Sequence, residues 1–179
     1  MIKTLFGPLP THNISGAQMN NAVMYFVYLW IPDSVNEIGV RMISPVPSLF
    51  TPDKGDIVAP DYADRAWSKK FFDPEVFLER ALNASNAADV FDKTKSMEWI
   101  QIAENDNSVE LLAQPTGEKK NSLLRIYANA EKKIRLPGGL YRIRFSGSKG
   151  KNPIGNFILQ AGITENISGV KLFRIAEEL

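Results

Sequence analysis

The segment KKIRLPGGLYRIRFS, residues 132–146, carries the clearest structural signal in this chain. On both sides of Gly138-Gly139, apolar and basic residues alternate, which is typical of β-strands that bury one face. A two-residue Gly-Gly turn predicts a β-hairpin that joins Lys132–Leu136 to Leu140–Ser146. In that register Leu136 lies opposite Tyr141 on the buried face, and the apolar rows of the two strands agree.

The other face of this predicted hairpin is basic. It places Arg135 opposite Arg142 and Lys133 opposite Arg144, and each like-charge pair costs about 0.2–1 kcal/mol. Either carboxylates of a neighbouring strand or an anionic ligand must offset this repulsion. Trp67, which stands among cationic residues, has a ring that can stack on a sugar. Two interpretations stay open: a neighbouring strand of the same chain supplies acidic residues, or this face binds an anionic ligand.

Short apolar segments separated by turn residues predict further strands on both sides of this hairpin. Residues 22–31 (AVMYFVYLWI) are rich in aromatic and β-branched residues, and their length favours a strand buried on both faces. A second hairpin is expected to join residues 97–103 to residues 109–113, and further strands are expected at residues 38–43, 123–128, 157–163 and 170–175. This spacing predicts a mainly β fold, an antiparallel β-sandwich of jelly-roll-like type.

Two of these segments resemble strands of galactose-binding-like jelly rolls. They are LPGGLYRIRFSGS, residues 136–148, and NFILQAGI, residues 156–163, which follow each other across a glycine-rich loop. The likeness implies the jelly-roll-like arrangement alone, and no binding residue is carried over from it.

The remaining parts of the chain predict one helix, one long loop and one arm. Asp73 is a suitable N-cap, and apolar residues recur at helical spacing behind it, so a short helix is expected at residues 74–84. Four prolines within residues 44–66 predict a long Pro-rich loop with at most one short strand at residues 56–59. Residues 1–21 read as an irregular N-terminal arm with an edge strand at Ile2–Phe6. All of residues 1–179 are expected to form a single domain.

The composition excludes several kinds of chemistry. The chain has no cysteine and one histidine, His12, so disulfides, thiolate nucleophiles and multi-histidine metal sites are excluded within it. No nucleotide-binding glycine motif occurs, and the sequence favours a non-catalytic protein without cofactors. Calcium stays open, because the Pro-rich loop offers oxygen ligands. The same carboxylates are the basis of an alternative function, a carboxylate-dependent hydrolase: Asp53, Asp56, Asp61 and Asp64.

Charge is unevenly distributed, although the formal net charge is +1. Residues 73–110 contain nine acidic and three basic residues, a net charge of −6. Residues 119–151 contain ten basic residues and one acidic residue, a net charge of +9. Two interpretations stay open. The segments neutralise each other across the fold, or the basic segment forms a surface for an anionic partner.

We therefore predict a non-catalytic recognition domain for an anionic or sugar-bearing surface, such as an anionic glycan, a membrane surface or a partner protein. Its predicted ligand-binding residues are Lys133, Arg135, Arg142, Arg144 and Trp67. An alternative is a structural subunit of a virion, an appendage or a toxin complex, in which oppositely charged segments join copies into a homo-oligomer. Nucleic acid is not an expected partner. The longest apolar run is too short for a transmembrane helix, and a secreted or extracytoplasmic location is favoured over a cytoplasmic one.

Overall fold

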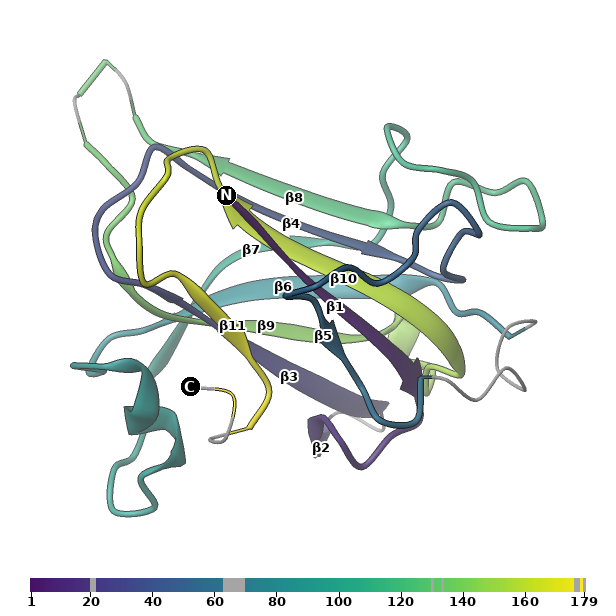
Figure 1. The fold of residues 1–179 in the computed structure, drawn as a ribbon, viewed down its shortest axis with the longest axis horizontal. Helices are drawn as coiled ribbons and strands as arrows, with labels where there is room; N and C mark the ends of the chain where they lie inside the picture. Colours follow the sequence, from purple (N-terminus) through teal and green to yellow (C-terminus); the bar gives the residue numbers. More distant parts are fainter. Residues whose placement is uncertain (20–21, 63–69, 130, 133, 176–177, 179) are drawn as a thin grey trace.

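Two β-sheets packed face to face form the protein (Figure 1). The computed structural model describes residues 1–19, 22–62, 70–129, 131–132, 134–175 and 178. Sheet A contains, in spatial order, β5 (Ile57–Val58), β1 (Ile2–Leu9), β10 (Gly155–Ile163), β4 (Glu37–Ile43) and β8 (Ser122–Tyr127). Sheet B contains β11 (Lys171–Phe173), β3 (Ala22–Ile31), β9 (Gly139–Gly147), β6 (Pro74–Ala81) and β7 (Trp99–Asn105), with β2 (Ser15–Met19) also paired to β3.

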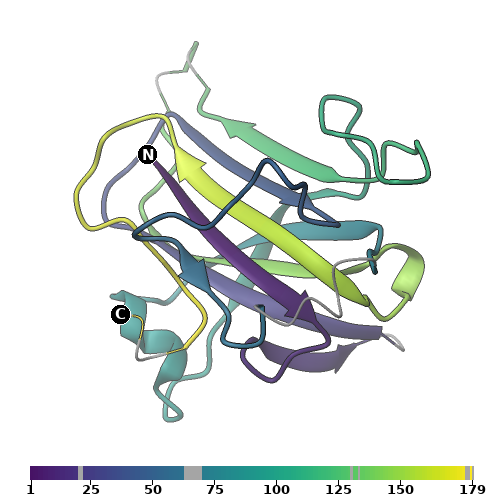
Figure 2. The same ribbon diagram turned by 45° about the vertical axis from the view of Figure 1, so that its right-hand side comes forward.

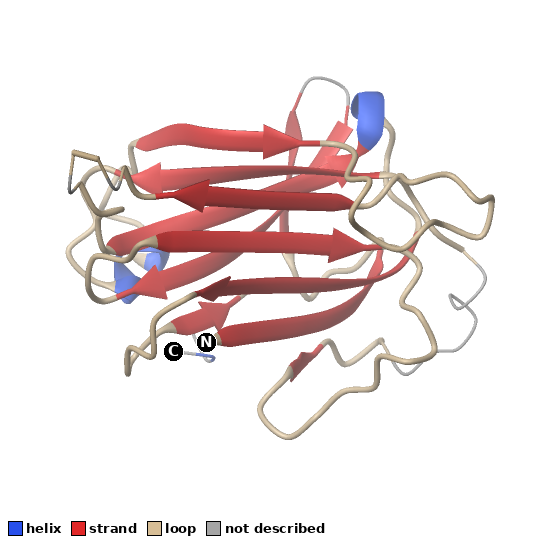
Figure 3. Ribbon diagram, turned by 90° about the horizontal axis from the view of Figure 1, so that it is seen from above, coloured by secondary structure: helices blue, strands red, loops and turns tan. Residues whose placement is uncertain are grey.

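Most neighbouring strands in these sheets are antiparallel, and the described pair β1–β5 is parallel. Strands make up most of the regular structure, and the helical turns are short (Figure 3). The predicted mainly β antiparallel sandwich is confirmed. In chain order the long strands alternate between the sheets except at β6 and β7, which follow each other in sheet B. Strands β1, β4, β8 and β10 lie in sheet A, and β3, β6, β7 and β9 lie in sheet B.

The N-terminal segment is part of the sandwich. The predicted strand at Ile2–Phe6 is confirmed and extends to Leu9, but it is not an edge strand, and the irregular arm predicted around it is wrong. Strand β1 lies between β5 and β10, and its register with β10 runs from Ile2 opposite Gly162 to Leu9 opposite Gly155 (Figures 1 and 2). The turn-forming Gly7 lies inside β1 because the ring of Phe157 fills the space above it. A Cβ atom at that position would lie 3.0 Å from Phe157 Cζ.

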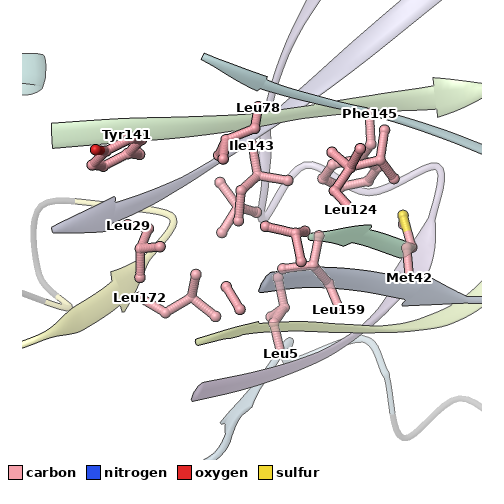
Figure 4. Packing of buried hydrophobic residues seen from close by; sticks show 14 of the residues in the cluster. Leu5, Leu29, Met42, Leu78, Leu124, Tyr141, Ile143, Phe145, Leu159 and Leu172 are labelled. Carbon is pink, nitrogen blue, oxygen red and sulfur yellow. The ribbon is translucent and has the colours of Figure 1, made fainter. Parts of the chain in front are cut away.

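The main core lies between the two sheets and is built from alternate residues of each strand (Figure 4). Strand β9 shows the pattern clearly, since Tyr141, Ile143 and Phe145 are buried in this core while Arg142 and Arg144 face the other way. The predicted division of β9 into an apolar inner row and a basic outer row is therefore confirmed.

The predicted pairing of the Gly138-Gly139 hairpin is wrong. Strand β9 lies between β3 and β6, and these two strands occupy both of its hydrogen-bonding edges. Each of them is longer than the segment 132–136 predicted to pair there. The preceding segment makes only isolated bridges, of which one joins Leu136 to Val35, and Ile134 is 58% exposed. A Cβ atom on Gly138 would lie 2.9 Å from the backbone of Asp33, so this glycine permits a close backbone crossing instead of a hairpin turn.

The predicted helix at residues 74–84 is also wrong, because Pro74–Ala81 forms strand β6 in the middle of sheet B. Val76 and Leu78 enter the main core, and Phe77 is buried on the opposite face. Because Phe77 is apolar although it lies on the outer face, the run from Val76 to Leu78 shows no alternation, and its residues also fit helical spacing. The helical turn η2 (Ala87–Phe91) follows instead, with Asn86 as its N-cap. Residues 109–113, predicted as a strand, form turns and loop.

Two smaller apolar clusters cover the outer faces of the sheets. On sheet B, η2 and the residues around it pack on Tyr28 and Phe173. On sheet A, Phe50 and other loop residues pack on Phe6, Ile43 and Ile158. The described part of the Pro-rich loop, residues 44–62, contains one short strand, β5, as predicted. This loop packs on one part of the outer face of sheet A, and among the described residues the part around Gly39 and Gly162 stays open.

Candidate binding surface

Arg142 and Arg144, two of the predicted ligand-binding residues, lie together on the outer face of sheet B. Glu79 of β6 lies between their side chains, with 2.6 Å from Glu79 Oε2 to Arg142 Nη2 and 3.2 Å from Glu79 Oε1 to Arg144 Nε. The three side chains are only 10%, 18% and 11% exposed in the order Glu79, Arg142, Arg144. We call these three residues the Glu79 cluster.

Aromatic rings complete the surroundings of the Glu79 cluster. The guanidinium carbon of Arg142 lies 4.2 Å from the ring centroid of Trp99, and that of Arg144 lies 4.0 Å from the ring centroid of Phe77. A guanidinium group that stacks on an aromatic ring and pairs with a carboxylate has little charge and few N–H donors left for a ligand. The acidic neighbour that the sequence left as an alternative is therefore present, and it comes from the acidic segment 73–110.

The other predicted ligand-binding residues do not extend this pair. Arg135 lies outside the strands, where its Nη2 atom is 2.9 Å from Oε1 of Glu165. The same carboxylate oxygen accepts a hydrogen bond from the backbone N–H of Asn36. Lys133 and Trp67 lie outside the described residues. Arg135 is not aligned with Arg142 and Arg144, because the segment that carries it does not pair with β9 as the predicted hairpin requires.

A different surface has the features of a binding site, and it lies on the open part of the outer face of sheet A. One row across β1, β10, β4 and β8 consists of Ile2, Gly162, Gly39 and Arg125, and the next row contains Thr4, Gln160, Arg41 and Leu123. These rows enclose a hollow of about 300 Å³. We call this hollow the Gly39 groove and define it by six of its lining residues: Ile2, Gly39, Arg41, Arg125, Gln160 and Gly162.

The two glycines on the floor of the groove exist for different reasons. A Cβ atom on Gly162 would lie 2.5 Å from the carbonyl oxygen of Met1, so the backbone of the neighbouring segment requires this glycine. A Cβ atom on Gly39 would meet only the carbonyl oxygen of Leu124, at 4.0 Å. A glycine inside a strand destabilises it by about 0.5–1 kcal/mol relative to alanine, and it often marks a place where a ligand approaches closely. Packing around a Cβ atom therefore does not require glycine at position 39, and the missing side chain adds to the space of the hollow.

Arg41 stands at the end of the Gly39 groove without a carboxylate partner. Its Nε atom donates a hydrogen bond to Gln160 Oε1, and Gln160 Nε2 in turn donates to Thr4 Oγ1 at 3.2 Å. The guanidinium carbon lies 5.5 Å from the ring centroid of Phe50. Among the described residues no carboxylate oxygen lies within 4.0 Å of this guanidinium, and its partial burial lowers the pKa of Arg41.

Each of the other described arginines contacts at least one carboxylate or carbonyl oxygen of the protein. Arg125, Arg135 and Arg174 each pair with a glutamate, as do the two of the Glu79 cluster. Arg80, which also lacks a carboxylate, donates to the carbonyl oxygen of Gly138 at 3.1 Å. Arg41 differs from all of them because it borders the Gly39 groove on one side and a second hollow, of about 410 Å³, on the other.

At the opposite end of the groove, Arg125 is paired and its charge is balanced. Its Nε atom lies 2.8 Å from Oε1 of Glu37, and its guanidinium carbon lies 5.3 Å from the ring centroid of Tyr127. The excess charge of the groove is therefore the single positive charge of Arg41. Sequence reasoning missed this residue because one arginine in a short strand has no local signature. The available signal was the isolated Gly39 two positions earlier in a strand pattern.

The aspartates proposed as calcium ligands or hydrolytic carboxylates are engaged in local contacts where they are described. Asp56 Oδ2 accepts a hydrogen bond from the backbone N–H of Asp53 at 2.8 Å, and Asp61 Oδ2 accepts one from Thr11 Oγ1 at 2.8 Å. Asp64 lies outside the described residues. In the part of the chain that the structure describes, no group of three or more acidic or histidine side chains is placed to hold a metal ion.

Comparison with known proteins identifies the family of this chain. The Lipl32 family, described as surface lipoproteins of the order Spirochaetales, matches residues 2–172. A search of curated proteins finds no match. Across the described segments no helix has the length and hydrophobicity needed to span a membrane. The surface location of the family confirms the extracytoplasmic location expected from the sequence. Because the match covers almost all of the 179 residues, the chain belongs to the Lipl32 family of spirochaete surface lipoproteins.

Proposed function

We propose that the protein is a non-catalytic recognition domain that binds an anionic ligand on the cell surface, with Arg41 in the Gly39 groove as the anion-binding residue. The observation that carries this proposal is that Arg41 is partly buried beside two hollows and has no carboxylate partner among the described residues. A partly buried charge without a partner is costly, and an incoming anion offsets this cost.

The ligand is anionic, as the sequence predicts, but its proposed site is the Gly39 groove on sheet A and not the basic face of β9. The Glu79 cluster offers little to a ligand, because its two arginines already share a carboxylate and stack on aromatic rings. Arg41 presents the opposite situation. Gln160 fixes the guanidinium through Nε, and this hydrogen bond leaves the Nη atoms to contact a ligand. An orienting hydrogen bond of this kind reduces the entropy that is lost on binding.

The finer identity of the partner is part of this proposal. An anionic glycan, an anionic membrane surface and an acidic protein surface all offer the required charge. We favour the glycan, since the groove is small and has polar groups at both ends, which suits a single sugar ring more than a flat membrane or protein surface. The jelly-roll-like detail of the fold is also a proposal, supported by the interleaved strand orders β1-β10-β4-β8 and β3-β9-β6-β7.

Binding to three immobilised anionic surfaces tests the proposal: polygalacturonate, heparin and phosphatidylglycerol vesicles. We expect binding to at least one of them at about 20 mM salt, with clear weakening at about 300 mM salt. Arg41→Gln should weaken this binding about tenfold or more. Arg135→Gln is the matched control, because it removes an exposed arginine that is already paired with Glu165. Absence of binding to all three surfaces, or equal losses in the two variants, would contradict the proposal.

A further inference from the structure

Building on the proposed function, we infer that the Gly39 groove recognises a carboxylated sugar, that is, a uronic acid residue of a glycan. The inference rests on three features of the groove that the charge of Arg41 alone does not explain. They are its flat glycine floor, the polar groups at its rim, and the geometry of the free guanidinium edge.

The floor of the groove fits one flat ring. Gly39 and Gly162 are direct partners in the β4–β10 pairing, so two neighbouring positions on this face carry no side chain. The hollow above them, about 300 Å³, lies at the small end of the range for ligand pockets and corresponds to one ring with its substituents. Ile2, which is 67% exposed, supplies an apolar wall for the C–H groups of a sugar.

The rim of the groove offers both donors and acceptors, as the hydroxyl groups of a sugar require. Glu37 and Arg125 form an ion pair on one side, and Gln160 and Thr164 also line the hollow. The Glu37 carboxylate accepts hydrogen bonds, the Arg125 guanidinium donates them, and their contact with each other fixes both side chains. Fixed polar groups around a small apolar floor orient a ligand and give specificity.

The guanidinium of Arg41 selects a carboxylate. Because Nε is occupied by Gln160, a ligand meets the edge formed by the two Nη atoms. Two parallel N–H groups match the two coplanar oxygens of a carboxylate, and the pair is then bidentate. The single excess charge of the groove matches one carboxylate and is insufficient for a dianionic phosphate. An acidic side chain of a protein would satisfy Arg41 but would leave the flat glycine floor uncovered.

Chemical-shift titrations of the backbone amides of the full chain test the ligand class. The probe is methyl β-D-glucuronoside, and the comparison ligands are methyl β-D-glucoside, acetate, glucose 6-sulfate and N-acetylglutamate amide. We expect the glucuronoside to bind at least tenfold more tightly than each comparison ligand, with the largest shifts at Gly39, Arg41 and Gly162. Equal or tighter binding of glucose 6-sulfate would overturn the carboxylate assignment. Equal or tighter binding of N-acetylglutamate amide would overturn recognition of a sugar in favour of an acidic protein segment.

Gly39→Val separates this inference from the proposed function. The added side chain has room on Gly39 and fills the floor of the groove, so the melting temperature should not fall. In Gly39→Val we expect glucuronoside binding to weaken at least tenfold, while acetate binding changes less than twofold. In Gly39→Ala we expect a smaller loss of glucuronoside binding. Arg41→Gln should remove the binding of both ligands.

The results of these variants distinguish failure of the sugar inference from failure of the proposed function. Unchanged glucuronoside binding in Gly39→Val, with loss in Arg41→Gln, overturns the sugar inference and supports the proposed function. Unchanged binding of every anion in Arg41→Gln overturns both. If Gly39→Val fails to fold, Gly39→Ala decides the sugar inference, because its single methyl group lies in open space.

Discussion

Glu79 faces Arg142 directly across the β6–β9 pairing, and 2.6 Å separates Glu79 Oε2 from Arg142 Nη2. The second oxygen of the same carboxylate accepts a hydrogen bond from Arg144 at 3.2 Å. One acid of the segment 73–110 thus neutralises two neighbouring bases of the segment 119–151. Here the oppositely charged segments of the sequence meet within a single chain.

Glu79→Gln should destabilise the protein by about 3 kcal/mol, because it leaves two poorly exposed guanidinium groups without their carboxylate. The free energy of unfolding in urea measures the effect. Glu165→Gln is the matched control, since it breaks the pair with Arg135, whose side chain is 45% exposed, and should cost under about 1 kcal/mol. Similar small losses in both variants would mean that the Glu79 cluster is not a structural ion pair.

Arg142→Gln combined with Arg144→Gln should also destabilise the protein, by about 2 kcal/mol or more, because Glu79 is then left without its cations. The contacts of the guanidinium groups with Trp99 and Phe77 are lost as well. Urea unfolding measures the loss. Binding to the anionic surface that the wild type recognises should persist in the folded double variant. If the double variant is more stable than the wild type and no longer binds the anionic surface, the anion-binding site lies on the outer face of β9 at Arg142 and Arg144.

Gly39→Val and Gly162→Ala should have opposite effects on stability. The first adds a β-branched side chain to a strand at a position where a Cβ atom meets only the carbonyl oxygen of Leu124, at 4.0 Å, and should stabilise by about 0.5–1 kcal/mol. The second forces a methyl group to within 2.5 Å of the carbonyl oxygen of Met1 and should destabilise by about 1–3 kcal/mol. Thermal unfolding of the two variants beside the wild type checks both signs. Destabilisation by Gly39→Val would show that its glycine is required by packing.

Asp89 should make the segment that covers sheet B sensitive to acid. The Lys95 ammonium, 2.7 Å away, and the backbone N–H of Ser85 hold the pKa of Asp89 at about 2, below its usual value of 3.8. A lowered pKa stabilises the folded state above pH 3.8, and this contribution is lost as the pH falls from about 3.8 to about 2.

Hydrogen exchange of the backbone amides of residues 85–95 measures this effect. We expect protection in this segment to fall between pH 4 and pH 2, after correction for the intrinsic exchange rate. In Asp89→Asn the segment should be less protected at neutral pH and show little further change on acidification. Equal acid sensitivity in the wild type and the variant would assign the effect to another group.

The sequence predicts the orientation of β9 well and its neighbours poorly. The alternation of Tyr141, Arg142, Ile143 and Arg144 fixes which side chains enter the core, since that pattern is local. The strands beside β9 are distant in the chain, and nothing in the segment 132–146 specifies them. Strand β6 is mistaken for a helix because Phe77, on its outer face, is apolar and buried, so the run from Val76 to Leu78 does not show the period of two that marks a strand.

The candidate site shows a similar division. A basic row on the outer face of β9 is predictable, but its neutralisation by Glu79 depends on a pairing between segments more than 60 residues apart. The Gly39 groove depends on four strands that place one residue each in a row. Gly39 is visible in the sequence as an isolated glycine, whereas its partner Gly162 and the unpaired state of Arg41 follow only from the arrangement of the sheet.

The position of β1 between β5 and β10 has a consequence for how the protein is made. The backbone N–H of Ile163 donates a hydrogen bond to the carbonyl oxygen of Met1, and β1 pairs with β10 along its whole length. Sheet A therefore cannot close until β10 has been synthesised, and such distant pairings form slowly. Until then the edge of β1 that later pairs with β10 has no partner, so this half of the sandwich is among the last parts to form.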